Sequence, residues 1–104
     1  MYAVYTTENF DKEINKLTQE EQMRVQKIFL QLKDNPYVGK QLQYKFLREK
    51  RLKEKRIYYL IYDDLKVVLI VATSGKKNQQ ETINHIINNF SEYKIYLERI
   101  LTKN

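Results

Sequence analysis

The densest group of residues that could do chemistry is a basic run from Lys40 to Arg56. This run holds eight of the 19 lysines and arginines but only two of the 13 acidic residues, so it alone carries a charge of +6. The other 11 basic and 11 acidic residues cancel. A local positive field attracts polyanions such as nucleic acid, an anionic membrane surface or an acidic protein. The alternative is a solvated surface that only aids solubility.

The cations of this run alternate along a predicted strand. Side chains of a strand point in turn to opposite faces, so Arg48 and Lys50 share one face. Because the strands of a hairpin lie close together, we expect Arg48 or Lys50 to sit across from Arg56 or Tyr58. Uncompensated cations on neighbouring strands repel each other, which favours a site that an anion normally occupies.

Tyrosines near these cations add stacking surfaces for unpaired bases. Tyr59 shares its face with Ile57 and Ile61, which favours a place in the core, so Tyr58 is the stronger functional candidate. The tyrosines considered for stacking are Tyr44, Tyr58, Tyr59 and Tyr62.

Several classes of site are excluded by composition. The chain has no cysteine and one histidine, so we expect no disulfide, no metal and no cofactor held by a Cys/His cage. His85 lies among asparagines, where a lone histidine is more often an ordinary helix residue than a proton-transfer group. No apolar run approaches the roughly 20 residues that span a bilayer, and the first residues do not resemble a signal peptide, so we expect a cytoplasmic protein with no membrane partner.

The first third of the chain predicts a strand and two helices within one domain, residues 1–104. Residues 2–6 alternate as in a strand, and Thr7 is placed as the N-cap of a short helix. Thr18 and Glu21 have capping-box spacing, so a second helix begins there, and Asn35-Pro36 ends it. The residues expected to face the core are Phe10, Ile14, Leu17, Val25, Ile28, Phe29 and Leu32.

The rest of the chain predicts a meander of three antiparallel strands, over residues 44–52, 56–62 and 67–73, followed by a helix. The last strand is apolar at both parities, which predicts a central position buried on both faces. The C-terminal helix follows from apolar spacing after residue 82, and Ser91 marks a point where it can break. The expected fold is α+β, in the order β-α-α-β-β-β-α, with an antiparallel sheet, two N-terminal helices on one face and a C-terminal helix.

The order of these elements resembles that of the RelE/ParE toxins of type II toxin–antitoxin systems. The stretch RIYYLIYDDLKVVLIVATSGKK is similar to their R-x-x-Y strand, acidic turn, apolar strand and G-K-R ending. The likeness in element order covers nearly the whole chain, and the motifs lie within residues 46–80. FLREKR followed by KKNQQ also resembles a group of small RelE-like proteins common in archaea.

The resemblance implies roles for four residues of the basic run and the loop after the third strand of the meander. Arg56 matches the arginine that contacts the scissile phosphate in ribosome-dependent RelE nucleases, and Lys77 falls on the arginine of G-K-R. Arg48 and Lys50 are similar in position to two basic residues of the preceding strand. The turn length differs by about one residue, so the alternate pair of that strand, Glu49 and Arg51, could replace them.

These nucleases attack with the 2′-OH of the RNA itself, so they need a base, cations for the phosphorane and a proton donor for the leaving oxygen. A lysine flanked by arginines can lose its proton readily enough to act as the base, and Lys50 is the candidate. Family members often carry a tyrosine where this chain has Ile83, and Tyr58 or Tyr93 could substitute for it. Further expected RNA contacts are Lys45, Arg51, Tyr58, Lys76 and Gln80.

Three functions fit these residues. The first is a metal-independent mRNA endoribonuclease that acts with the ribosome, stops translation and is neutralised by an acidic antitoxin. The second is a ParE-type toxin that inhibits DNA gyrase through protein contacts, and the third is a plain RNA-binding module. The basic sheet with its tyrosines favours RNA, because gyrase inhibition does not require clustered cations for phosphoryl chemistry.

Overall fold

The strand that is apolar at both parities organises the sheet. In the computed structural model, which describes residues 1–103, β5 (Val67–Ser74) lies between β1 (Ala3–Thr6) and β4 (Lys55–Tyr62). Val68 and Ile70 pack into a core on one side of the sheet, and Leu69 and Val71 pack into a second core on the other side. The predicted central position of this strand is therefore confirmed.

The sheet has five strands in the order β1-β5-β4-β3-β2, with β3 at Leu47–Leu52 and β2 at Lys40–Gln41. The pairs β2–β3, β3–β4 and β4–β5 are antiparallel, whereas β1 runs parallel to β5. The α+β class is confirmed, and the predicted element order holds apart from the added short strand β2 and a C-terminal segment that forms two helices. The sheet is mixed rather than wholly antiparallel. The chain crosses over through two helices and the meander before β5 forms, which is the long connection that parallel strands require.

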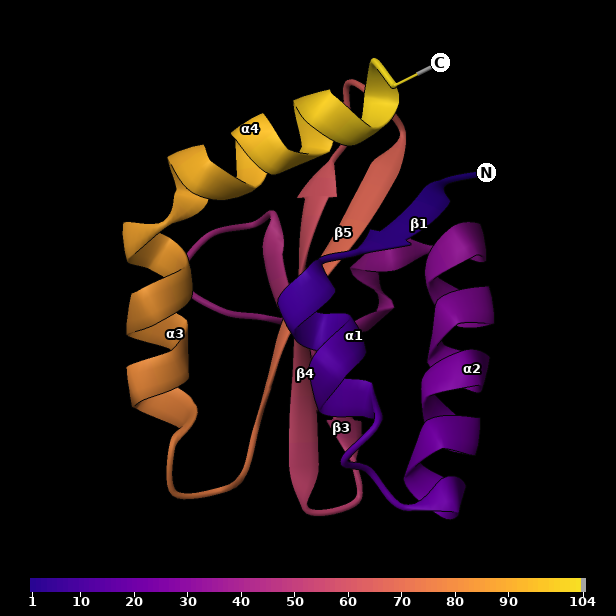
Figure 1. Cartoon of the computed structure of the whole chain (residues 1–104), viewed down its shortest axis with the longest axis vertical. Coiled ribbons are helices and arrows are strands. Elements are labelled where there is room, and N and C mark those ends of the chain that lie inside the picture. The colour runs from indigo at the N-terminus through magenta and orange to yellow at the C-terminus, as the bar shows by residue number, and fades with distance from the viewer. Residues whose placement is uncertain (104) are drawn as a thin grey trace.

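Two helices cover the first face, α1 (Glu8–Ile14) and α2 (Gln19–Asp34), as Figure 1 shows. The Thr7 hydroxyl accepts a hydrogen bond from the Phe10 N–H at 3.1 Å, and Thr18 and Glu21 form the predicted capping box. Such caps satisfy backbone N–H groups that the first helical turn leaves without partners. A 3₁₀ turn, η1 (Pro36–Val38), follows α2.

The C-terminal segment forms two helices, α3 (Gln79–Asn88) and α4 (Phe90–Leu101). They divide at Asn89, two residues before the break expected at Ser91. Figure 1 shows α3 standing beside the sheet and α4 crossing its upper end. No helix within residues 1–103 has the length and apolarity needed to cross a membrane.

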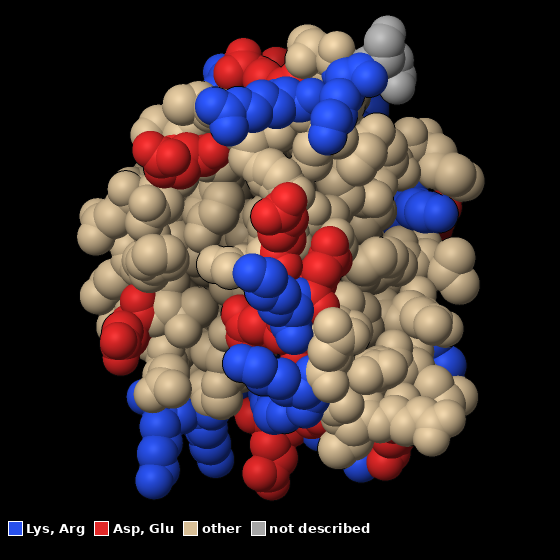
Figure 2. All heavy atoms as spheres, in the orientation of Figure 1, with Lys and Arg blue, Asp and Glu red and all other residues tan. Residues whose placement is uncertain are grey.

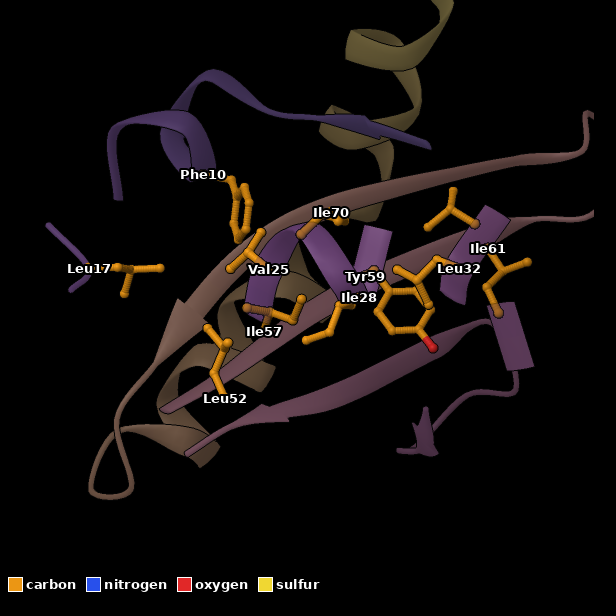
Figure 3. Packing of buried hydrophobic residues seen from close by; sticks show 11 residues of the cluster. Phe10, Leu17, Val25, Ile28, Leu32, Leu52, Ile57, Tyr59, Ile61 and Ile70 are labelled. Atoms are coloured by element: carbon orange, nitrogen blue, oxygen red, sulfur yellow. The ribbon is translucent and has the colours of Figure 1, made fainter. Parts of the chain in front are cut away.

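The first core lies between α1, α2 and the sheet (Figure 3). Five of the seven helix residues expected there are buried, but Ile14 and Phe29 are only partly buried at its edge. The second core lies on the α3 side and contains Leu47, Tyr58, Leu60 and Ile86. Both faces of the sheet are therefore covered by apolar packing.

A buried tyrosine joins the end of α2 to the sheet. The Tyr59 hydroxyl donates to the Pro36 carbonyl at 2.6 Å and accepts from the Gly39 N–H at 3.1 Å. A Cβ atom on Gly39 would lie 2.7 Å from the backbone oxygen of Glu49, so this close approach requires glycine. The contact holds the chain against β3 immediately before β2 begins.

The first core predicts a large stability difference between two leucines of α2. Leu32 is fully buried and Leu30 is 66% exposed. We expect Leu32→Ala to lower the free energy of unfolding by about 2–5 kcal/mol, because the deletion leaves a cavity. Leu30→Ala should change it by less than about 0.5 kcal/mol, and urea unfolding of both variants measures the difference. Equal losses would contradict the packing of α2.

The Tyr59 contact predicts a pH dependence. Burial raises the pKa of Tyr59 to about 12 from its ordinary 10.0. Above pH ~10 the unfolded chain releases this proton first, so stability falls as pH rises toward ~12. Tyr59→Phe should lower the free energy of unfolding by about 1–3 kcal/mol at neutral pH, because Pro36 and Gly39 lose their partner.

Tyr59→Phe lacks the titrating hydroxyl. The difference between its free energy of unfolding and that of the wild type should therefore shrink by up to about 2–3 kcal/mol between pH ~10 and ~12. Denaturant unfolding across this pH range gives the measurement. Tyr62, whose pKa burial also raises to about 12, titrates in both proteins and cancels in the comparison. A constant deficit across the range would show that Tyr59 does not titrate as its burial implies.

Candidate functional site

The turn between β3 and β4 decides which charges share a face. Lys53 and Glu54 form a two-residue connection, so Leu52 pairs with Lys55 and Arg51 pairs with Arg56. Lys50 therefore pairs with Ile57, and our expectation that Arg48 or Lys50 faces Arg56 or Tyr58 was wrong. The alternative register holds, in which Glu49 and Arg51 lie on the same side of the sheet as Arg56 and Tyr58.

Arg56 lies in a small hollow at the edge of the sheet. The hollow has a volume of about 290 Å³ and is lined by Val38, Lys40, Glu49, Lys50, Arg51 and Arg56. Lys40 of β2 is the register partner of Glu49. The four cations and one carboxylate leave a formal excess of three positive charges, which suits a site for a phosphate group.

Two residues that line the hollow form an ion pair. Arg56 Nε is 3.6 Å from Glu49 Oε2, and the two side chains are only 12% and 10% exposed. Within the described residues, Glu49 Oε2 is buried and has no hydrogen-bond partner. An acceptor in this condition retains the capacity to take a proton or a hydrogen bond from a bound molecule.

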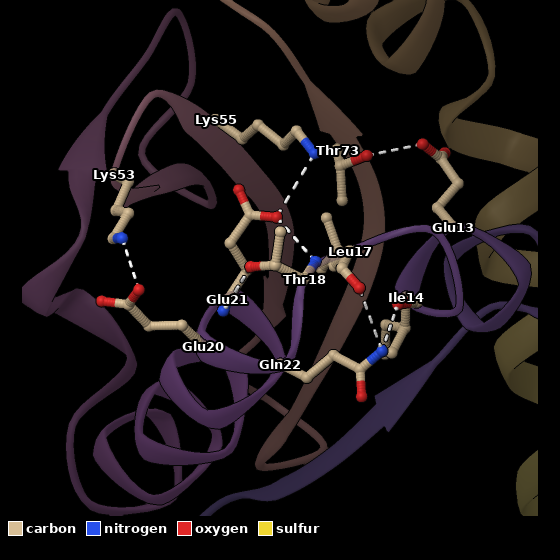
Figure 4. Close-up of polar contacts among 10 residues, drawn as sticks. All are labelled: Glu13, Ile14, Leu17, Thr18, Glu20, Glu21, Gln22, Lys53, Lys55 and Thr73. Carbon is tan, nitrogen blue, oxygen red and sulfur yellow. Dashed lines mark hydrogen bonds and ion pairs between the residues drawn. The ribbon is translucent and has the colours of Figure 1, made fainter.

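Other cations of the basic run are engaged elsewhere, which corrects the expectation of an uncompensated cluster. Lys53 lies 2.6 Å from Glu20 and Lys55 lies 3.4 Å from Glu21, both at the start of α2 (Figure 4). The Arg48 guanidinium donates to three backbone carbonyls, those of Tyr37, Gly39 and Lys45 at 2.9–3.3 Å. Arg48 therefore supports the chain after α2 and does not line the hollow.

Tyr58 is fully buried, so it offers no stacking surface for a base, contrary to our expectation. Its hydroxyl lies 2.8 Å from the Ser74 hydroxyl, and burial raises its pKa. The α3 side of the sheet is covered by the second core, which includes this ring. Alternation along β4 predicts that Tyr58 and Tyr59 face opposite sides of the sheet, but it does not reveal that both faces of β4 are covered.

The lysines after β5 do not line the hollow. Arg56 pairs with Ser74, the last residue of β5, and Lys76 and Lys77 follow in the connection to α3 with exposed side chains. Figure 1 places this connection at the lower left, where Figure 2 shows basic side chains projecting from the surface. Lys77 thus follows the strand that neighbours Arg56, three residues beyond its end.

The remaining expected residues lie on other elements and do not line the hollow. Gln80 is exposed on α3 and donates to Asn84 at 3.0 Å, and Lys45 lies over the Tyr37 ring at 5.8 Å. Tyr93 packs against the second core, as Ile83 does, so neither side chain lines the hollow. Within residues 1–103, no group of three or more His, Cys, Asp or Glu side chains is arranged to hold a metal ion.

Comparison with known proteins identifies the fold. No protein-family model and no curated protein sequence matches the chain. A free mutant of the E. coli toxin RelE superposes with a TM-score of 0.72 at 20% identity, over 85% of this chain and 96% of that one. RelE of the Pyrococcus horikoshii RelE–RelB complex gives 0.66 at 19% identity, over 72% and 94%. A Mycobacterium tuberculosis toxin–antitoxin complex of the RelBE type gives 0.62 at 25% identity, over 72% and 91%. The chain therefore has the RelE fold.

The ion pairs predict which cations contribute to polyanion binding. Arg51 lines the hollow, whereas the charge of Lys53 is offset by Glu20. We expect Arg51→Ala to reduce the slope of log K against log salt concentration by about 0.7 for a single-stranded RNA, because one phosphate contact is lost. Lys53→Ala should leave the slope nearly unchanged. Fluorescence anisotropy at several salt concentrations measures both, and equal slopes for the two variants would contradict the assignment.

Proposed function

We propose that this protein is the toxin of a toxin–antitoxin pair and that it cleaves mRNA on the ribosome, with the hollow around Arg56 as its active site. The observation that carries the proposal is the recessed Arg56–Glu49 pair, surrounded by further cations, in a chain with the RelE fold. The structures that share this fold include complexes of RelE with the antitoxin RelB. Ribosomes and mRNA as targets place the protein in the cytoplasm.

The proposed reaction is an internal transesterification. The 2′-oxygen of one nucleotide attacks the adjacent phosphorus, and the bond from phosphorus to the 5′-oxygen breaks. The products are a 2′,3′-cyclic phosphate and a free 5′-hydroxyl. The 2′-OH proton passes to a base, and a donor supplies a proton to the 5′-oxygen, so side chains can perform both transfers.

Arg56 and Arg51 are the proposed phosphate-binding groups. They are register partners on neighbouring strands, so their side chains project from the same side of the sheet. A guanidinium has a planar fork of donors that fits two phosphate oxygens at once. Charge held at a position where negative charge develops lowers the barrier, since it is already oriented before the reaction. Lys77, in the connection between β5 and α3, is the proposed third cation.

Two residues of the hollow are candidates for the base, Glu49 and Lys50. Lys50 lines the hollow, but its register position belongs to the side of the sheet that faces α2. Glu49 lies beside Arg56 and has a buried oxygen without a partner. A carboxylate accepts a proton directly, whereas a lysine must first lose one, so we favour Glu49.

The proposed partner is an acidic antitoxin segment that covers the hollow and contacts α4. The excess of positive charge supports a partner with carboxylates, and exposed apolar residues on α4, among them Ile95, supply contact area. A groove of about 920 Å³ between α4, α1 and β5 lies beside these residues. Salt should weaken this complex, because screening reduces the attraction between exposed charges.

Arg56→Ala tests the proposed site. We expect it to reduce single-turnover cleavage of ribosome-bound mRNA by about 10²–10³-fold and to abolish growth arrest. Lys53→Ala is the control, because this residue belongs to the same hairpin and pairs with Glu20 outside the hollow. Circular dichroism should remain close to the wild type. A loss below about 3-fold, under 1 kcal/mol of barrier, would refute the site.

The same assay separates the two candidate bases and the competing functions. Glu49→Gln keeps the size of the side chain but cannot take the proton, so it should depress the cleavage rate far more than ribosome binding if Glu49 is the base. Lys50→Ala gives the corresponding result if Lys50 is the base. Wild-type protein that inhibits gyrase supercoiling and leaves mRNA intact would instead indicate a gyrase inhibitor.

A further inference from the structure

Three aromatic rings gather at the surface where the loop between β2 and β3 meets the start of α4. The Tyr44 and Phe46 rings stack with centroids 5.3 Å apart and an interplanar angle of 29°. Phe90 meets both rings edge to face, at 5.3 Å and 5.2 Å. We call Tyr44, Phe46 and Phe90 the aromatic platform.

The platform keeps substantial exposure although its rings contact one another. Tyr44 is 37% exposed and Phe46 is 39% exposed. Large aromatic side chains gain from burial, so exposed ring surface that is already ordered favours a binding role. The loop backbone is also fixed, since the Leu47 N–H donates to the Tyr44 carbonyl at 3.0 Å and the Ile61 N–H donates to the Phe46 carbonyl at 2.8 Å. Little conformational entropy remains to be lost on binding.

The charge on this side of the sheet favours nucleic acid over an apolar partner. The hollow around Arg56 carries a formal excess of three positive charges. Lys45 and Arg48 do not add to this charge, because they lie at 5.8 and 5.0 Å over the Tyr37 ring, which packs against the first core. Aromatic rings combined with a cationic groove bind unpaired bases and their phosphates.

The platform lies on the same side of the sheet as the Arg56 hollow. Phe90 packs against the second core, which contains Leu47, and Leu47 shares its strand face with Glu49 and Arg51. Phe46 precedes Arg51, the register partner of Arg56, by five residues, roughly 17 Å along an extended strand. A base a few nucleotides away from a phosphate held at Arg56 can therefore reach the platform.

We propose that the aromatic platform stacks an unpaired base of the RNA whose phosphate occupies the Arg56 hollow. This inference rests on the proposed function, and it assigns Tyr44 and Phe46 as residues that position RNA without taking part in the reaction. Base stacking on an aromatic ring is tolerant of sequence, because every base has a π-face. The platform would therefore add affinity and register without choosing a base.

The test separates stacking from anchoring of the loop. Leucine at Tyr44 or Phe46 keeps apolar contacts within the cluster but removes the π-face, whereas Tyr44→Phe keeps the ring. We expect Tyr44→Leu and Phe46→Leu each to weaken binding of a short single-stranded RNA by about 5- to 100-fold. Tyr44→Phe should stay within about 2-fold, and the salt dependence of binding should be unchanged in all three, because no phosphate contact is lost.

A second measurement uses wild-type protein, so it does not depend on how the variants fold. Short RNAs that carry 2-aminopurine at successive positions should show quenched fluorescence at one position on binding, and Phe46→Leu should restore it. The proposal fails if no position is quenched, or if both leucine variants bind RNA as the wild type does. It also fails if these variants weaken only binding of a partner protein, which would make the platform a protein contact. RNA binding and quenching without ribosome-dependent cleavage would refute the proposed function and leave the platform intact.

Discussion

The register between β3 and β4 is the constraint on which the site depends. Slipping one strand by one residue would exchange the faces of all its side chains, so Arg48 and Lys50 would replace Glu49 and Arg51 beside Arg56. Apolar packing opposes this slip, because Leu47 is buried in the second core and Leu52 in the first. The cores thus fix the positions of charges that do not themselves contribute to apolar packing.

Ion pairs with α2 stabilise the turn between β3 and β4. Lys53 has a φ of 56°, a left-handed conformation that is unfavourable for lysine. Its ammonium pairs with Glu20 at 2.6 Å, and Lys55 pairs with Glu21, so the first turn of α2 holds the turn in place. Acidic residues are also favoured at the N-terminus of a helix by its dipole. The same carboxylates therefore stabilise α2 and offset two of the cations, and the remaining excess is concentrated at the hollow.

The parts of the fold that could be predicted from sequence are those that local patterns determine. The caps at Thr7 and Thr18 depend on neighbours three residues away, and the apolar composition of β5 predicts burial on both of its faces. The partners of β3 depend on a turn whose length the motif match left open by one residue. The burial of Tyr58 depends on α3, which packs on the sheet from a distant part of the chain. Long-range packing, which local patterns do not contain, therefore decided which residues form the candidate site.

Glu49 explains how the hollow remains stable without a ligand. Arg51 and Arg56 are register partners, and like charges directly across two strands repel each other. The carboxylate of Glu49 lies 3.6 Å from Arg56 and reduces this repulsion, although its own burial is unfavourable without a full set of partners. A phosphate that enters the hollow would provide stronger compensation for the arginines and would release Glu49 from that role. The carboxylate of Glu49 would then be available to accept the 2′-OH proton of the bound RNA. The same residue therefore stabilises the hollow before RNA binds and serves as the base in the proposed reaction.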